Sequence, residues 1–213
     1  MRKILIVSGI IIAVIIAVCG VKSIVHSKKE YKIQKEIAGS LIRFHVRANS
    51  DSDEDQNLKI KVKNEIVTYL RKRMDGVTAL DEARKILYDD SDFIRNMAVA
   101  AVRAAGYDYD VKVHFTEEYF PLKQYGDMSF PPGEYEAFRV DIGDAEGRNW
   151  WCVLFPPLCF VDSTLSVVPD SSKDSFRVLL SEEAYRTVTM KSLSSGNCRI
   201  RFKYFKFLNK IFE

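Results

Sequence analysis

The chain has 213 residues, of which 47% are hydrophobic and 29% are charged, so it is long enough and apolar enough to bury a real core. Its formal net charge is only +3, and the basic residues are spread among acidic ones. This distribution argues against a nucleic-acid-binding protein, which would need a concentrated basic surface.

The N-terminus carries a membrane signal. Arg2 and Lys3 precede an uninterrupted apolar run over residues 4–21, which ends at Lys22. Because this run is longer than a usual signal-peptide core and slightly short for a spanning helix, residues 1–27 are predicted to be either a signal peptide or a signal anchor. The lysines after the run favour keeping that side in the cytoplasm, whereas its N-terminal position favours export. We expect export, with cleavage left open.

The remainder is predicted to form one domain. Residues 28–40 are charged and mildly helical, which is typical of a tether or of a first helix lying on the domain. Residues 41–213 are too few for two comfortable domains and are predicted to form a single extracytoplasmic domain.

Residues 41–48 alternate between apolar and polar side chains, which predicts a half-buried strand. The apolar side consists of Ile42, Phe44, Val46 and Ala48. The other side carries Arg43, His45 and Arg47, which we expect to lie at the surface.

Three helices are predicted next. Ser52 and the acids after it favour the start of a helix that runs to about Met74. A second helix follows Thr78, and a third runs from Ser91 or Asp92 to a stop at Gly106. The run DSDED at residues 51–55 resembles the opening of a calcium loop, but Gln56 stands where the turn glycine belongs, so helix capping is preferred.

The second half reads mainly as strands. Residues 109–116 and 135–142 alternate with a period of two, and the proline- and aromatic-rich segment 117–133 between them is expected to cover something. Ser181 is predicted to cap a short helix, and residues 199–204 a last strand. The predicted fold class is α+β, a two-layer arrangement with helices packed on one face of a mostly antiparallel sheet, preceded by the apolar signal or anchor helix.

Residues 149–163, NWWCVLFPPLCFVDS, combine both tryptophans with two of the four cysteines. We predict a strand over residues 150–155, a stop at Pro156 and Pro157, and an antiparallel return over residues 158–161. Cys152 would then face Cys159 at a Cα separation of about 4.5 to 5.5 Å, within the span of a disulfide. The pair forms either that bridge, which export favours, or two buried thiols.

No catalytic, metal-binding or redox motif is present, and no cofactor is expected. The cysteines lack zinc spacing, and Cys198 is left over. His45 or His114 with nearby carboxylates could serve a hydrolase, which we keep as the alternative function. The tail RIRFKYFKFLNKIFE, residues 199–213, either packs in the core or contacts a membrane or a partner groove.

Two segments resemble the stage II sporulation protein R family: IRFHVRANSDSDEDQNLKIKVKNEI at residues 42–66 and GRNWWCVLFPPLCFVDS at residues 147–163. The resemblance extends to YDVKVHF at Tyr109 and SFPPGEYEAFRVDIG at Ser129. It implies an exported, non-enzymatic signalling protein of endospore-forming bacteria, acting between the forespore and mother-cell membranes. There such proteins trigger a membrane-embedded aspartic protease, the stage II GA sporulation protein, which processes the precursor of sigma factor E.

The partner-binding surface is hypothesised from exposed positions on three predicted segments, namely the first strand, the aromatic segment and the hairpin tip. Its candidate residues are Arg43, His45, Arg47, Tyr125, Phe130, Phe155, Pro156 and Pro157.

Overall fold

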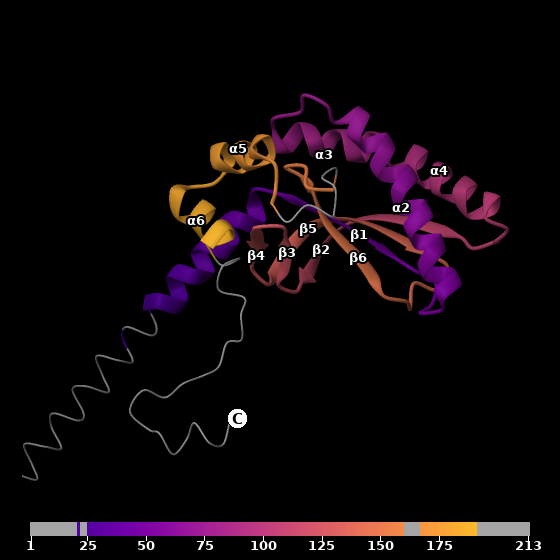
Figure 1. Cartoon of the computed structure of the whole chain (residues 1–213), viewed down its shortest axis with the longest axis horizontal. Helices are drawn as coiled ribbons and strands as arrows, with labels where there is room; N and C mark the ends of the chain where they lie inside the picture. The colour runs from indigo at the N-terminus through magenta and orange to yellow at the C-terminus, as the bar shows by residue number, and fades with distance from the viewer. Residues whose placement is uncertain (1–20, 22–24, 160–166, 191–213) are drawn as a thin grey trace, which may run out of the picture.

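The computed structural model describes Val21, residues 25–159 and residues 167–190. These residues form a four-stranded sheet and a separate two-stranded ribbon, with helices on both sides (Figure 1). The strands are β1 (Ile42–Arg47), β2 (Val111–Phe120), β3 (Lys123–Tyr125), β4 (Met128–Phe130), β5 (Gly133–Ile142) and β6 (Asn149–Phe155). The helices are residues 25–39, α2 (Asp53–Arg73), α3 (Leu80–Asp89), α4 (Ser91–Ala104), α5 (Asp170–Leu179) and α6 (Glu182–Met190).

The sheet has the order β2-β5-β1-β6. β2 pairs antiparallel with β5, and β6 pairs antiparallel with β1, whereas β1 and β5 run parallel. The prediction of an α+β fold with a mostly antiparallel sheet is confirmed. The parallel pair arises because β2, which follows the three helices, runs opposite to β1, and β5 then reverses direction from β2 and lies between β2 and β1.

One face of the sheet is covered by α2, α3 and α4 (Figure 1). The Ser52 side chain accepts a hydrogen bond from the Asp55 N–H at 3.2 Å, so the predicted cap does begin α2. The apolar side of α2, including Leu58, Val62 and Ile66, is buried. On α3, Tyr88 stacks on Phe115 of β2 with ring centroids 4.4 Å apart. This side of the sheet is the main core.

A second group of elements covers one end of the opposite face. The predicted arrangement, with helices on one face of the sheet only, is therefore incomplete. The helix of residues 25–39, the β3–β4 ribbon, α5 and α6 gather at the left of Figure 1. Ile37 is fully buried, and Phe130 packs on Phe176 of α5 with centroids 5.4 Å apart. Residues 28–40 therefore include a helix that packs on the domain.

The covering segment 117–133 is more regular than expected. β2 continues to Phe120, and the residues after it form the β3–β4 ribbon instead of an irregular loop. α5 is an element that the sequence analysis missed.

Several expectations fall outside the described residues. They are the apolar run apart from Val21, the return strand beyond Cys159, the strand of residues 199–204, Cys198 and the C-terminal tail. Within the described residues, no helix combines the length and the apolar character needed to cross a membrane.

Candidate functional site: the polar face of the sheet

The sheet face opposite α2, α3 and α4 carries a set of polar and charged side chains from all four strands. Register fixes this arrangement, because residues paired across strands point to the same side. One row across the sheet reads Asn149, Arg47, Asp141 and Lys112, and the next reads Trp151, His45, Arg139 and His114. We call the following residues the polar face: Arg43, His45, Arg47, Lys112, His114, Glu118, Arg139, Asp141 and Asn149.

Ion pairs link the middle of the polar face. Arg139 contacts Glu118 through NH1, and its Nε lies 3.0 Å from Asp141 Oδ2. His114 Nε2 lies 3.3 Å from the same Asp141 oxygen. Among the described residues, Arg47 and Lys112 have no such partner. Besides the buried Arg43, the polar face therefore contains two cations without an ion pair that reach the surface, beside the network around Arg139.

His45 lies at the centre of this face and is fully buried. Burial, together with the positive charges of Arg139, Arg47 and Arg43, lowers the pKa of His45 to about 3. Its Nε2 is 3.1 Å from Glu118 Oε2, yet neither ring nitrogen is aligned for a hydrogen bond with a described residue. We conclude that His45 is neutral at physiological pH.

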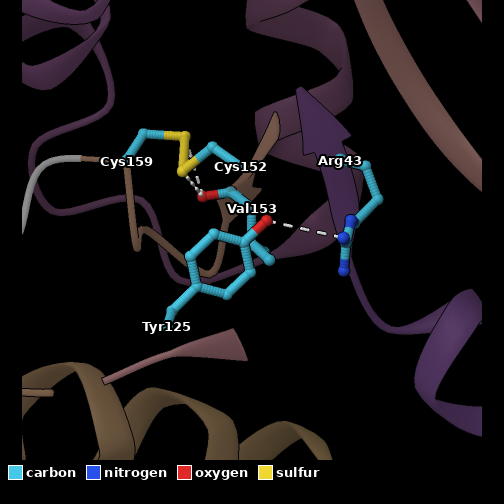
Figure 2. The surroundings of a disulfide bond; sticks show 5 residues. All are labelled: Arg43, Tyr125, Cys152, Val153 and Cys159. Atoms are coloured by element: carbon cyan, nitrogen blue, oxygen red, sulfur yellow. Dashed lines mark hydrogen bonds between the residues drawn. A yellow bond between two sulfur atoms is a disulfide. The ribbon is translucent and has the colours of Figure 1, made fainter. Parts of the chain in front are cut away.

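Arg43 is enclosed by aromatic rings. Its Cζ lies 4.6 Å from the ring centroid of Phe120, 5.0 Å from that of Tyr135 and 5.5 Å from that of Phe130. Its NH2 donates a long hydrogen bond, 3.5 Å, to the Tyr125 hydroxyl (Figure 2). Burial lowers the pKa of Arg43 and raises the pKa of Tyr135 to about 12. The cation–π contacts between Arg43 and these rings therefore hold the β3–β4 ribbon against β1.

The structure corrects the predicted surface positions. Arg43 and His45 are 0% exposed, and only Arg47 of the three is partly exposed. The reason is that Phe120, Trp151 and the ribbon cover this side of β1. The fold does bring Arg43, Tyr125 and Phe130 together, but as interior contacts.

The predicted hairpin tip is also mostly interior. Phe155 is 2% exposed, Pro156 is buried and Pro157 is half-buried. Leu158 and Cys159 make a turn in place of the start of a return strand, since both of their N–H groups donate to the Val153 carbonyl, at 3.0 and 3.2 Å. The turn thus folds back onto β6.

A disulfide joins Cys152 and Cys159, whose Cα atoms are 5.5 Å apart, so the predicted pairing is present although a turn and not a strand brings Cys159 to Cys152 (Figure 2). The Cys159 Sγ also lies 3.0 Å from the Val153 carbonyl oxygen. The bridge therefore fixes the turn against the strand that precedes it.

The polar segment after β1 contacts the start of α2 and the loop before β6, which lie at the same end of the sheet. The buried Asp55 carboxylate accepts hydrogen bonds from Ser50 Oγ at 2.6 Å and Asn49 Nδ2 at 2.9 Å, and such bonds lower the pKa of Asp55. Asp51 Oδ1 accepts from the Arg148 N–H at 2.6 Å. These acids serve as a helix start and a loop anchor. The described residues contain no cluster of three potential metal ligands.

A groove of about 700 Å³ lies at the other end of the domain, away from the polar face. It runs between the helix of residues 25–39, the turn at residues 131–134 and α6. Several of its charged side chains pair with one another: Lys29 with Glu183, and His26 with Glu30. The polar face, where polar groups converge without partners, is the stronger candidate site.

Comparison with known proteins supplies the family. The family model described as stage II sporulation protein R matches residues 38–165. The chain belongs to the stage II sporulation protein R family. The resemblance inferred from residues 42–66 and 147–163 is therefore confirmed, and membership of the stage II sporulation protein R family implies a role in sporulation.

A curated relative in this family is Stage II sporulation protein R of Bacillus subtilis (strain 168). It is 34% identical over 126 residues, which cover 59% of this chain and 56% of the relative. The match thus spans little more than half of the relative's length. No solved structure matches the chain. All residues of the polar face lie within the stretch that matches the stage II sporulation protein R family.

Sequence reasoning missed Lys112, Glu118, Arg139, Asp141 and Asn149 as members of the site. The alternation in residues 135–142 does place Arg139 and Asp141 on one side of a strand. What the sequence did not reveal is the register that puts them beside β1.

Proposed function

We propose that this chain is an exported signalling protein of sporulation that binds and activates a membrane-embedded aspartic protease of the mother cell. That protease, the stage II GA sporulation protein, would then process the precursor of sigma factor E. The observation that carries the proposal is the family match over residues 38–165. The chain would act by binding and not by chemistry.

The geometry supports binding better than the hydrolase alternative. A general base must reach the substrate and must hold a proton in the transition state. His45 is fully buried, and a pKa of about 3 makes it a weak base. The ion-pair partners of the two imidazoles in the part of the chain that the structure describes are carboxylates, Asp141 for His114 and Glu118 for His45.

The disulfide between Cys152 and Cys159 supports export, because such bonds persist in oxidising compartments. We propose that the domain works in the space between the forespore and mother-cell membranes. It would be either released there or held by its N-terminal segment.

Activation needs a difference in affinity. A ligand shifts a protease towards its active state only if it binds that state more tightly than the idle one. A difference of about 3 kcal/mol in binding free energy between the two states would shift the equilibrium between idle and active protease roughly a hundredfold.

Co-expression in a non-sporulating host tests the proposal. The full chain is produced with the protease and the sigma factor precursor, and processing is followed by immunoblot. Processing should need all three proteins, and it should fail when residues 1–27 are deleted or the protease's catalytic aspartates are replaced. A precursor that stays intact in the presence of the full exported chain would contradict the proposed function.

A further inference from the structure

The polar face concentrates unpaired polar atoms. Of the nine buried side-chain nitrogens and oxygens without a hydrogen-bond partner among the described residues, eight belong to it, and the ninth is Gln34 Nε2. They come from Arg43, His45, Arg47, Arg139, Asp141 and Asn149. Folded proteins satisfy nearly all buried polar groups, so a cluster of exceptions calls for an explanation.

These atoms include both donors and acceptors. Arg47 Nε and Arg139 Nε are donors, whereas Asp141 Oδ1 and Asn149 Oδ1 are acceptors. Asp141 is the most telling, because its side chain is only 10% exposed and one of its oxygens stays unpaired beside two basic groups. These atoms are themselves shielded from solvent, so a ligand would meet the more exposed side chains around them.

The charge of this region indicates which kind of ligand it would bind. Arg47 and Lys112 flank Asp141 in one row of the sheet, and neither has an ion-pair partner among the described residues. With Arg139 in the next row, three cations stand against two carboxylates, Asp141 and Glu118, and both carboxylates already contact Arg139. This part of the face is therefore positive and suits an acidic ligand.

The face is open where these residues lie. Lys112 is exposed, Arg47 is partly exposed and the His114 side chain is 37% exposed. The helices α2, α3 and α4 lie on the other side of the sheet, and α5 and α6 gather at its far end (Figure 1).

We propose that the open part of the polar face docks an acidic segment of a partner polypeptide, with Arg47 and Lys112 as the side chains that bind its carboxylates. A polypeptide segment is favoured over a single phosphate group because Arg47 and Lys112 lie on β1 and β2 with β5 between them, roughly 10 Å apart at the usual strand spacing, so two carboxylates along one chain can reach both. The inference rests on the proposed function only for the identity of the partner, the mother-cell protease.

Peptide binding tests the surface directly. The full chain, purified in detergent micelles, is titrated with a fluorescein-labelled peptide of alternating Glu and Val and with its Gln and Val counterpart. The acidic peptide should bind more tightly, with an affinity that falls as salt rises. Lys112→Glu and Arg47→Glu should each weaken binding about tenfold or more. Lys72→Glu, an exposed change on α2, should leave binding unchanged.

Lys112→Glu is the decisive variant because Lys112 is exposed and its replacement need not disturb folding, which an unchanged melting curve checks. Equal binding of the two peptides, or full binding by Lys112→Glu, would overturn the proposal. Displacement of the acidic peptide by phosphatidylglycerol, but not by phosphatidylcholine, would identify a lipid head group as the better ligand and would also overturn it.

The co-expression assay separates this inference from the proposed function. If the wild-type chain binds the acidic peptide but triggers no processing, the docking surface stands and the signalling function fails. If processing occurs and Lys112→Glu retains both processing and peptide binding, the function stands and the docking surface is wrong.

Discussion

The imidazole of His45 lies flat against the indole of Trp151, with ring centroids 4.9 Å apart and planes within 3° of each other. The two residues are paired across β1 and β6, so the stack is set by strand register. It closes His45 off from water beneath an otherwise polar sheet face. A proton on this ring would be buried beside three arginines as well as Glu118, and the folded state favours the neutral ring.

The stability of the protein should therefore fall in acid through His45. Its pKa is about 3 in the folded state and about 6.5 when unfolded, so the unfolded chain binds the proton more readily. This contribution to the free energy of unfolding is complete above pH 6.5 and is lost as the pH falls towards 3. Between pH 6.5 and 4 it amounts to about 3 kcal/mol.

Urea denaturation of the wild-type chain and of His45→Phe at pH 7, 6, 5 and 4 measures this effect. Phenylalanine keeps an aromatic ring on Trp151 but cannot be protonated. The variant should lose less stability between pH 7 and pH 4 than the wild type. Parallel pH profiles would show that His45 titrates normally in the folded protein.

Gly147→Ala should loosen the contact between the loop after β1 and the loop before β6. A Cβ at residue 147 would lie 2.1 Å from the backbone oxygen of Ser50, which cannot move aside easily. We expect a loss of about 2 kcal/mol in the free energy of unfolding. Gly39→Ala is the matched control, because a Cβ there meets nothing within 4 Å, and in this helical position it should leave stability unchanged or raise it by up to about 1 kcal/mol. Equal effects would refute the steric argument.

The ion pair between Arg84 and Glu136 should stabilise the packing of α3 on β5. Two parallel bonds join them, Nε to Oε1 at 2.7 Å and NH2 to Oε2 at 2.8 Å. Arg84→Met should cost about 1 kcal/mol, since bidentate pairs are stronger than single surface contacts. Lys85→Met breaks an exposed pair with Asp89 on the same helix and should cost close to nothing. Thermal melts of the two variants would decide, and similar melting temperatures would count against the prediction.

Loss of the disulfide should destabilise the chain modestly. The bridge joins two residues only seven positions apart in the sequence. For so short a loop the chain-entropy model gives a stabilisation of about 2 to 3 kcal/mol. Cys152→Ser with Cys159→Ser should lower the free energy of unfolding by that amount. Reductant should reproduce the loss in the wild type and have little further effect on the double variant. A wild type insensitive to reductant would mean that the bridge contributes nothing.

The sequence predicted local elements well because capping and periodicity are local properties. Ser52 does begin α2, and Gly106 does follow the end of α4. The prediction that Arg43 and His45 are exposed was wrong. Alternation shows that both side chains lie on one side of β1. Whether that side contacts water depends on Phe120, Trp151 and the β3–β4 ribbon, which are distant in sequence. α5 was missed because its apolar face is sparse, with Phe176 its buried anchor.

The candidate site was beyond sequence reasoning for a related reason. The parallel pairing of β1 with β5 puts His45 beside Arg139 and Arg47 beside Asp141, over ninety positions away. No local pattern encodes such a register. Only the polar character of the individual positions could be read in advance.

The turn after β6 has a consequence for how the protein behaves among its own copies. β6 is an outer strand of the four-stranded sheet, and its sequence NWWCVLF contains no charge. An uncharged, apolar edge invites a neighbouring molecule to add a strand and so begin aggregation. By occupying the Val153 carbonyl with two N–H groups, the bridged turn removes one hydrogen-bonding position from this edge and so hinders the addition of a strand there.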